Sequence, residues 1–543
     1  MKNGIGQYVL GLDLSTQSLS SVALDLDTAN TVFELSLNYR KDNRLLCYGI
    51  NSEYILPPKN EGEASQPVAM YFTAIDAIFN DMSARGFPLD QVAVINISAQ
   101  QHGHVYLNTK SPNRFNRLKV KESSQSCLVD LLCDSLAYHV APIWMTSNTI
   151  KQADSIREYS GGKQRIIEIT GSDTALRFTG VVMRKVAQQY PRVYDDTWRI
   201  MLLSNLISAI LCGNADTPVD FANACGMSLM DYHDKQWSNL MVEAVAEGIP
   251  GGVENFKAKL PAIVTPYTIV GRIAAYFVGK YGINPDCRIV VGSGDNPQSK
   301  VLVKQDLLSL GSSFVIMMAT DGNTFDFDGA ANAMYDGLGR PFIFGCRTNG
   351  TLVWDKFRME HGFPKDDFNI MEKQLQATSL GKYMTFWQPR TESFPPSGVV
   401  ALTNSDYPKA EPQENYTGLV EASLSSVFMH SNKFLKKNRG PLYVTGGVTS
   451  SGEIMRRVAA IWNRPVSVMA DSGAAIGAAL AGIYALSVIV KCEIDLDMLC
   501  SRLLNIKKQI IPNADDVAAF HSQGGYLDRF AIQEKRILAS AEK

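Results

Sequence analysis

The segment YVLGLDLSTQSLSSVALDL, residues 8–26, predicts the start of a β-sheet. Its first part, Tyr8–Asp13, is an apolar run of strand length, and its last part, Ser20–Leu26, contains a second apolar run at Val22–Leu24. The residues between them, Ser15–Ser18, are all polar. We therefore expect a β-hairpin whose tight turn exposes backbone N–H groups and hydroxyls.

Further strands along the chain also end in polar or glycine-rich loops. They are Gln91–Ser98 before AQQHGH, Arg288–Gly292 before SGDNP, Leu307–Leu310 before GSS, and Leu442–Thr445 before GG. Helical patterns fall between them at Ala69–Arg85, Val181–Tyr190, Arg199–Leu211, Gly418–Leu435 and Glu453–Trp462. Strands that alternate with helices predict an α/β fold with the loops along one edge of the sheets.

The chain also contains an internal echo. LGLDLSTQS (residues 10–18) and SLGSSFVIM (residues 309–317) each place Gly and then Ser or Thr in a turn between two strands. The similarity predicts two related domains that face one cleft, with a boundary near residue 300. No motif is recognisable after Leu486.

Composition excludes several classes of protein. The 543 residues include 52 basic and 54 acidic ones, for a net charge of −2, which gives no electrostatic footprint for nucleic acid or an anionic membrane surface. With 45% apolar and 20% charged residues, the chain is not intrinsically disordered. Its nine scattered cysteines form no C-x-x-C pair, so we expect reduced thiols and no zinc. The N-terminus lacks the apolar core of a signal peptide, and a cytoplasmic protein is expected.

One segment leaves a membrane anchor open. Residues 472–490, SGAAIGAALAGIYALSVIV, carry no charge and are long enough to span a bilayer. However, Gly473, Gly477 and Gly482 favour a buried helix that packs closely on a sheet. A second uncharged stretch, Ile200–Ala215, is expected to be a core helix.

The chain lacks a P-loop, the protein-kinase motifs, H-E-x-x-H and G-x-S-x-G, so nucleotide chemistry would need another design. The turn after Asp13 offers the hydroxyls of Ser15 and Thr16 to a phosphate, and Asp13 itself could hold Mg²⁺ through water. Alone, this turn also fits an ordinary hairpin. Gly311-Ser312-Ser313 repeats the same donors and favours a phosphate clamp.

Three further loops carry candidate chemistry. In GSGDNP (residues 292–297), Asn296 could cap a helix opened by Pro297, which would leave Asp295 to accept a proton from a sugar hydroxyl; the alternative is a capping turn with an idle acid. The loop QQHG (residues 100–103) offers hydrogen bonds to a polyol, although a lone histidine is often structural. Gly446-Gly447 could lie against adenine or form a plain turn.

The ordered set of motifs resembles the FGGY carbohydrate kinases, and within them the eukaryote-type xylulose kinases. The resemblance covers residues 8–486 and rests on GLDLSTQS, SAQQHGHVY, PIWMTSNT, LRFTG, GSGDNPQS, SLGSS and TGGVTSS, which occur in the family's order. It implies two ribonuclease-H-like, actin-like ATPase domains around a central cleft. Residues 1–300 would bind sugar and catalyse, residues 301–490 would bind nucleotide, and residues 491–543 would be an extension of unknown role.

The resemblance also implies ATP and Mg²⁺ between the domains and roles for individual residues. Asp295 would be the general base, and Asp13 would organise Mg²⁺, through water, and the phosphates. The residues that would hold the sugar are Gln101, His102, Arg177, Asp295 and Asn296. Those that would contact ATP are Asp13, Ser15, Thr16, Gly311, Ser312, Ser313, Gly446, Gly447, Val448 and Ser451.

Four departures from the family pattern bear on substrate and affinity. The acid of the family's W-M-D-S segment is Thr146, and an acid of its D-Y-S-D stretch is Asn223, although Asp220 remains. Both changes put the identity of the sugar in question. The Gly-Thr-Ser turn has become Gly311-Ser312-Ser313, and the adenine-side Asn has become Ser451, which could weaken ATP binding.

The sequence therefore predicts an ATP-dependent kinase that phosphorylates a ketose at its terminal hydroxyl, with D-xylulose and D-xylulose 5-phosphate as the expected pair. Two alternatives stay open: a kinase for another ketose or polyol, such as ribulose or a deoxy sugar, and a catalytically silent sugar or nucleotide sensor. The expected partners are sugar and ATP, without nucleic acid or membrane. The family resemblance allows a homodimer, but no residue pattern indicates one.

Overall fold

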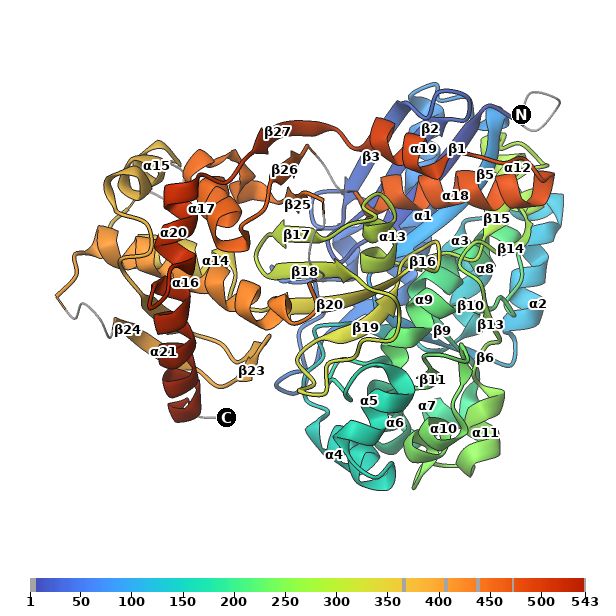
Figure 1. Cartoon of the computed structure of the whole chain (residues 1–543). Helices are drawn as coiled ribbons and strands as arrows, with labels where there is room; N and C mark the ends of the chain where they lie inside the picture. The colour runs from blue at the N-terminus through green and yellow to red at the C-terminus, as the bar shows by residue number, and fades with distance from the viewer. Residues whose placement is uncertain (1–5, 364–367, 405–408, 436–439, 471–472, 542–543) are drawn as a thin grey trace. The chain divides into compact units, whose positions relative to one another are not determined.

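The protein folds as two compact α/β units, which confirms the predicted fold class (Figure 1). The computed structural model describes residues 6–363, 368–404, 409–435, 440–470 and 473–541. Unit 1 comprises residues 1–302, 334–341 and 472–503, and unit 2 comprises residues 303–333, 342–471 and 504–543. This partition differs from the division expected at residues 300 and 490, because the chain returns to unit 1 after residue 471.

A mixed sheet forms the centre of unit 1. Its strands follow the order β14-β15-β5-β1-β2-β3, and β16 also pairs with β5. Their bounds are β1 Tyr8–Leu14, β2 Ser18–Asp25, β3 Thr31–Asn38, β5 Val92–Ala99, β14 Ile269–Arg272, β15 Arg288–Val290 and β16 Ser293–Gly294. The antiparallel pair of β1 and β2 confirms the predicted hairpin, and β1, β5 and β15 run parallel.

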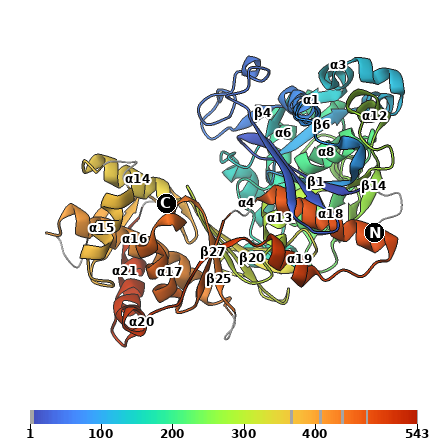
Figure 2. The same ribbon diagram turned by 90° about the horizontal axis from the view of Figure 1, so that it is seen from above.

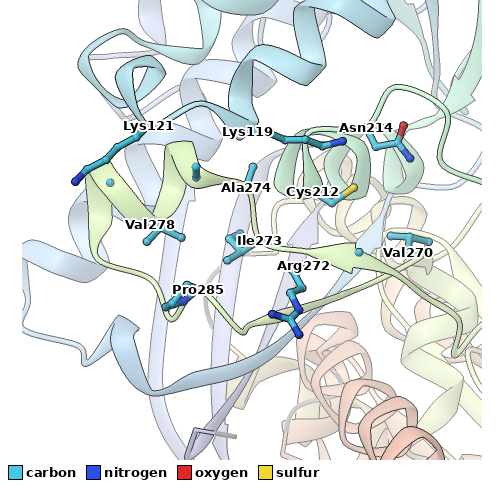
Figure 3. A pocket seen from close by; sticks show the side chains of 13 residues that line it. Lys119, Lys121, Cys212, Asn214, Val270, Arg272, Ile273, Ala274, Val278 and Pro285 are labelled. Carbon is cyan, nitrogen blue, oxygen red and sulfur yellow. The ribbon is translucent and has the colours of Figure 1, made fainter.

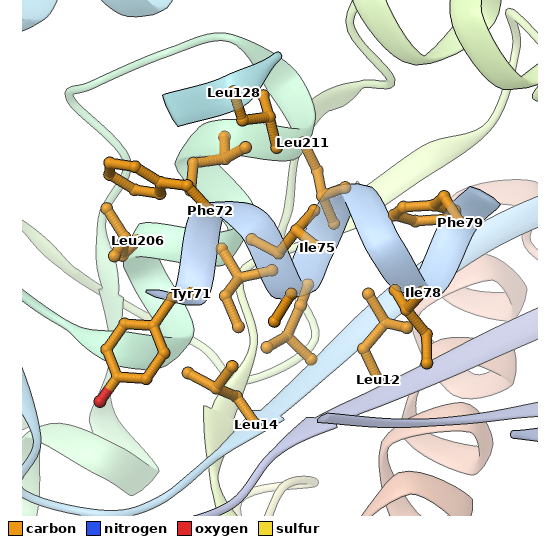
Figure 4. Close-up of a cluster of buried hydrophobic side chains, with 14 of the residues drawn as sticks. Leu12, Leu14, Tyr71, Phe72, Ile75, Ile78, Phe79, Leu128, Leu206 and Leu211 are labelled. Carbon is orange, nitrogen blue, oxygen red and sulfur yellow. The ribbon is translucent and has the colours of Figure 1, made fainter. Parts of the chain in front are cut away.

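Helices α1 (Val68–Ala84) and α8 (Leu203–Cys212) contribute to the main core of unit 1. Leu12 of β1, Ile75 of α1 and Leu206 of α8 are fully buried in the same cluster (Figure 4). Burial of each such side chain stabilises the fold by about 1.5–3 kcal/mol. The expected helix over residues 199–211 begins late, because residues 197–202 form strand β9 (Thr197–Leu202), which pairs with β6 (His104–Asn108).

Helix α18 (Ala474–Val490) packs on the sheet of unit 1, and Figures 1 and 2 show it alongside β1. A Cβ atom on Gly11 of β1 would lie 1.9 Å from the carbonyl oxygen of Ala475, and one on Gly477 would lie 1.9 Å from that of Gln298. The small residues therefore allow backbone-to-backbone packing, as the sequence predicts for a buried helix. Within the described residues, no helix is long and apolar enough to cross a membrane.

The sheet of unit 2 repeats the strand arrangement of unit 1. Six of its strands follow the order β20-β18-β17-β25-β26-β27. Their bounds are β17 Leu307–Leu310, β18 Phe314–Ala319, β20 Pro341–Arg347, β25 Leu442–Thr445, β26 Val466–Met469 and β27 Ile506–Ile510. The hairpin of β17 and β18 corresponds to that of β1 and β2, and β25 pairs in parallel with β17 as β5 does with β1. The internal echo in the sequence thus lies in two sheets that share the order and direction of five strands, whereas the sixth strand precedes its neighbour in unit 1 and follows it in unit 2.

The segment after residue 503 is an integral part of unit 2. Strand β27 pairs with β26, and helices α20 (Ala514–His521) and α21 (Tyr526–Ser540) pack on α17 (Gly452–Trp462) and α16 (Pro412–Asn432), respectively. The guanidinium of Arg456 donates two hydrogen bonds of 2.6 Å to the carboxylate of Asp516. The extension therefore braces the helix that follows the Gly446-Gly447 turn.

Candidate active site

Three strands of unit 1 end side by side at the candidate catalytic residues. Asp13 of β1 lies opposite Ser98 of β5, and Ser98 in turn lies opposite Ser293 of β16. The Ser98 hydroxyl donates a 2.6 Å hydrogen bond to Oδ1 of Asp13. Burial raises the pKa of the Asp13 carboxyl, and this hydrogen bond opposes the rise. The carboxyl ends of parallel strands therefore bring together residues from distant parts of the chain, as expected for an α/β site.

Asp295 follows β16 and begins helix α13 (Asp295–Val301). Its Oδ1 accepts hydrogen bonds from the backbone N–H of Asn296 at 2.8 Å and from Nδ2 of Asn296 at 3.1 Å. Burial, and after it the negative charge of Asp13, raise the pKa of Asp295 to about 7. A carboxyl group with this pKa can exchange a proton near neutral pH, which suits a general base.

The helix start differs from the sequence expectation. Gly294, and not Asn296, occupies the N-cap position, so Asn296 and Pro297 lie within the first turn. The amide of Asn296 instead donates a 2.8 Å hydrogen bond to Oε1 of Gln101. A Cβ atom on Gly294 would lie 2.4 Å from Cγ of Gln101, so the glycine permits this close approach. Asn296 therefore links the Asp295 turn to the loop after β5.

That loop also holds His102, whose ring is anchored by a contact with the backbone. His102 adopts a left-handed backbone conformation, with φ of 66°, and its Nδ1 lies 2.9 Å from the carbonyl oxygen of Gly226. Burial, and then the positive charge of Arg177, lower the pKa of His102 to about 3. The neutral ring donates from Nδ1 to the carbonyl, which leaves Nε2 as a hydrogen-bond acceptor. Among the described residues, the partly exposed Arg177 has no hydrogen-bond or ion-pair partner.

A buried acid that the sequence analysis left without a role supports the same turn. Asp220 accepts hydrogen bonds from the Ser293 hydroxyl at 2.7 Å and from the backbone N–H of Asn223 at 3.2 Å. Burial raises its pKa to about 7. In the described part of the chain, Oδ1 of Asp220, Oδ1 of Asn223 and Nε2 of Gln101 are buried without a partner. Such unpaired polar atoms are costly, and their presence beside Gly294 fits a site that receives a hydroxyl-rich ligand.

Protein contacts already engage the hydroxyls of the first turn. Ser15 Oγ lies 3.0 Å from the carbonyl oxygen of Ser18, to which it donates. Thr16 Oγ1 donates to Oε1 of Gln100 at 3.1 Å and accepts from Nε1 of Trp144 at 2.9 Å. These bonds fix the turn next to Asp13. Contact between either hydroxyl and a phosphate stays a prediction.

Two predicted nucleotide turns lie at one edge of the unit 2 sheet. Gly311, Ser312 and Ser313 connect β17 to β18, and Gly446 follows the adjacent parallel strand β25. A Cβ atom on Gly446 would lie 2.3 Å from the carbonyl oxygen of Leu310, so glycine is required for the two strand ends to meet. Ser312 is exposed, whereas the carbonyl of Gly311 accepts hydrogen bonds from the backbone N–H and hydroxyl of Thr351. The structure thus brings the two turns together within unit 2.

Ser451 caps helix α17, and its hydroxyl also donates to a residue absent from the sequence analysis. Its Oγ accepts from the backbone N–H of Ile454 at 3.0 Å and donates to Oε2 of Glu372, which lies on α15 (Phe368–Ala377). The other carboxylate oxygen, Oε1, accepts from the backbone N–H of Glu453 at 2.8 Å. No motif surrounds Glu372, so only the fold reveals this contact across 79 residues.

The surroundings of Asp13 suit a Mg²⁺ ion that is held through water, and not one that is coordinated by protein side chains alone. Among the described residues, no three His, Cys, Asp or Glu side chains cluster to hold a metal. Mg²⁺ commonly retains several waters and takes one or two carboxylates together with substrate phosphates. The hydrogen bond from Ser98 occupies Oδ1 of Asp13, so Oδ2 suits a water-mediated contact.

A cavity of about 840 Å³ in unit 1 is not the candidate site (Figure 3). Arg272 lines it and pairs with Arg288 at the amino end of β15, whereas Asp295 follows the carboxyl ends of the strands. Its lining residues include no Asp or Glu, so it offers no carboxylate base. The strand-end acids, and not this cavity, therefore remain the candidate site.

Comparisons with known proteins bear on the family and the fold of the chain. The N-terminal domain of the FGGY family of carbohydrate kinases matches residues 134–301. Xylulose kinase of Schizosaccharomyces pombe is 27% identical over 88% of this chain and 89% of its own length, and that of Rattus norvegicus is 28% identical over 98% and 97%. The crystal structure of gluconate kinase from Lactobacillus acidophilus superposes with a TM-score of 0.80 and 17% identity over 98% of both chains, which shows the shared fold.

Proposed function

Because the chain belongs to the FGGY family of carbohydrate kinases, we propose that it transfers the γ-phosphoryl group of ATP to the terminal hydroxyl of D-xylulose and forms D-xylulose 5-phosphate. The observation that carries the proposal is the placement of Asp295, a half-buried carboxyl directly after β16 at the strand ends, where burial, and after it the nearby charge of Asp13, raise its pKa to about 7. It stands at the strand ends where a sugar hydroxyl could reach it.

The reaction requires one proton transfer and one phosphoryl transfer. Asp295 accepts the proton of the attacking hydroxyl, whose oxygen forms a bond to the γ-phosphorus while the bond from that phosphorus to the bridging oxygen of ADP breaks. Asn296 keeps the Asp295 carboxylate oriented through its two hydrogen bonds. Mg²⁺, when bound, neutralises charge on the phosphate oxygens, and Asp13 would hold it through water.

The sugar would be oriented by the loop after β5 and by Arg177. Nε2 of His102 is available to accept from a hydroxyl, Nε2 of Gln101 is available to donate, and the Arg177 guanidinium can donate to a carbonyl or hydroxyl oxygen. Phosphoryl transfer depends mainly on such positioning, which makes these contacts central to turnover. On the nucleotide side, the turns at Gly311 and Gly446 would face ATP.

A second candidate is a kinase for another ketose or polyol. Thr146 stands where the family has an acid, and its hydroxyl donates a 3.0 Å hydrogen bond to the carbonyl oxygen of Ala64. Asn223 replaces a second acid beside Gly294. A neutral group in place of a carboxylate changes which hydroxyls are satisfied, so these two positions favour testing other sugars.

The test is ADP release with ATP and Mg²⁺ across pentuloses, hexuloses and polyols, with Asp295→Asn in parallel. We expect turnover on D-xylulose that falls about a hundredfold or more in the variant, while sugar binding persists. Turnover on a different sugar alone would reassign the substrate and keep the mechanism. If no sugar caused ADP release although sugar still bound, the protein would instead be a sensor. We also propose a cytoplasmic location, because nine scattered cysteines without a C-x-x-C pair suit a reducing compartment.

A further inference from the structure

Glu372 places a carboxylate at the turn where the nucleobase is expected. Its two oxygens accept from the Ser451 hydroxyl and from the backbone N–H of Glu453, at the N-terminus of α17. A Cβ atom on Gly452 would lie 3.1 Å from Oε1 of Glu372. The carboxylate is therefore packed directly against the segment that follows Gly446-Gly447, although it belongs to a different helix.

The two hydrogen bonds leave part of the acceptor capacity of Glu372 unused. An ionised carboxylate has about four lone-pair positions, and Ser451 and Glu453 occupy one on each oxygen. Glu372 is only partly buried, so part of the residue is open to solvent. Ser451 itself accepts from Ile454 and donates to Glu372, so its hydroxyl hydrogen is not available to a base.

A carboxylate in this place discriminates between purine bases. The 6-position of adenine carries an amino group, which donates hydrogen bonds, whereas that of guanine carries a carbonyl oxygen, which accepts them. The acceptor-only carboxylate attracts the first and repels the second. Lys508 of β27 lies near the same glycine, with Nζ 3.6 Å from the Cβ position on Gly452, and is the nearby donor that guanine could use instead.

We propose that Glu372 determines nucleobase specificity by accepting a hydrogen bond from the 6-amino group of adenine. This inference rests on the proposed function, because it takes the turn at Gly446-Gly447 as the nucleotide side. Glu372 thereby supplies the acceptor that Ser451, which stands where the family has Asn, does not provide. The residue acts on nucleotide binding and takes no part in proton transfer.

The test measures ADP and GDP binding by calorimetry in the full-length protein, together with ATP and GTP turnover. We expect the wild type to bind ADP at least about tenfold more tightly than GDP. Glu372→Gln keeps an oxygen for the Ser451 hydroxyl but replaces the acceptor of the Glu453 backbone N–H with an NH₂ donor. Because this donor suits the guanine carbonyl and not the adenine amino group, the ADP/GDP ratio should fall at least fivefold while the KM for sugar stays unchanged. Thermal unfolding would verify that the variant is folded.

Ser451→Ala is the matched control for a merely structural role. It removes the N-cap and one partner of Glu372 but leaves the carboxylate in place, so it should weaken both nucleotides alike and preserve their ratio. An unchanged ratio in Glu372→Gln, or an equal shift in both variants, would overturn the inference, as would failure of the wild type to prefer ADP. Loss of sugar phosphorylation with the ADP preference intact would instead contradict the proposed function alone.

Discussion

At the scale of single residues, the protonation of Asp295 sets the pH response of the proposed reaction. The base must be ionised, and its pKa is raised from 3.8 to about 7. We therefore expect kcat/KM for the sugar to fall about tenfold per pH unit below pH 7 and to level off above it. The residual activity of Asp295→Asn should lack this ionisation. A flat wild-type profile between about pH 5 and pH 8 would exclude Asp295 as the titrating base.

Asp220 should make stability, rather than turnover, depend on pH. Its pKa is raised from 3.8 to about 7 by burial, so between these values the folded protein holds a proton that the unfolded chain has lost. The free energy of unfolding must then fall as pH rises through this window. Asp220→Asn cannot ionise, and we expect it to gain at least about 1 kcal/mol relative to wild type between pH 5 and pH 8.5 in urea unfolding. If the free energy of unfolding differed between variant and wild type by the same amount at both pH values, ionisation of Asp220 would not be the cause.

Sequence reasoning finds the residues that carry a local signal and misses those that depend on distant contacts. GSGDNP singles out Asp295 and Asn296 because its glycines allow the backbone to approach a ligand closely and Pro297 marks a helix start beside the acid. Asp220 supports the same turn through Ser293, 73 residues away, and Glu372 reaches Ser451 from another helix. The residues next to Asp220 and Glu372 in the sequence give no signal of either contact. The expected roles of Arg177 and His102 in sugar binding remain predictions.

At the scale of elements, close packing between α18 and α13 supports the catalytic turn. A Cβ atom on Gly477 would come within 1.9 Å of the Gln298 carbonyl, and Gln298 lies three residues after Asp295. Gly477→Ala should force the helices apart, destabilise the protein by about 1–3 kcal/mol and lower kcat. Gly473→Ala on the same segment meets only Ile476, at 3.7 Å, and should change neither. Thermal unfolding and steady-state kinetics on both variants check this, and equal effects would refute it.

Element assignment from sequence succeeds where the pattern is decided locally. The hairpin over residues 8–26 and helix α17 follow from alternation and periodicity, and both are observed. The stretch at residues 197–211 has an apolar run that is compatible with either a strand or a helix. Pairing with β6 makes its first part a strand, and that pairing depends on residues about ninety positions earlier.

At the scale of the whole molecule, order in space departs from order in sequence. Small residues predict that residues 472–490 pack on a sheet, but they do not say which sheet, and the helix joins the first one. The chain then crosses back to unit 2 with β27, α20 and α21. Each unit is thus built from discontinuous segments, which a division of the chain at residues 300 and 490 does not represent.

The proposed binding of sugar by unit 1 and of nucleotide by unit 2 leads to an expectation for hydrogen exchange. If unit 1 binds sugar, D-xylulose alone should slow exchange in peptides that contain Gln101–His102 and Gly294–Asn296. If unit 2 binds nucleotide, ADP with Mg²⁺ should protect peptides that contain Gly311–Ser313 and Gly446–Ser451. Ligand binding stabilises the amides it covers, so protection should map to the site residues of the unit that binds. Peptides from α20 should change only with ADP, because Asp516 braces α17 through Arg456. If sugar protected only peptides of unit 2, the assignment of the sugar site to unit 1 would be wrong. If sugar protected α20, the effect of sugar binding would reach unit 2 by a route other than the contact between α17 and α20.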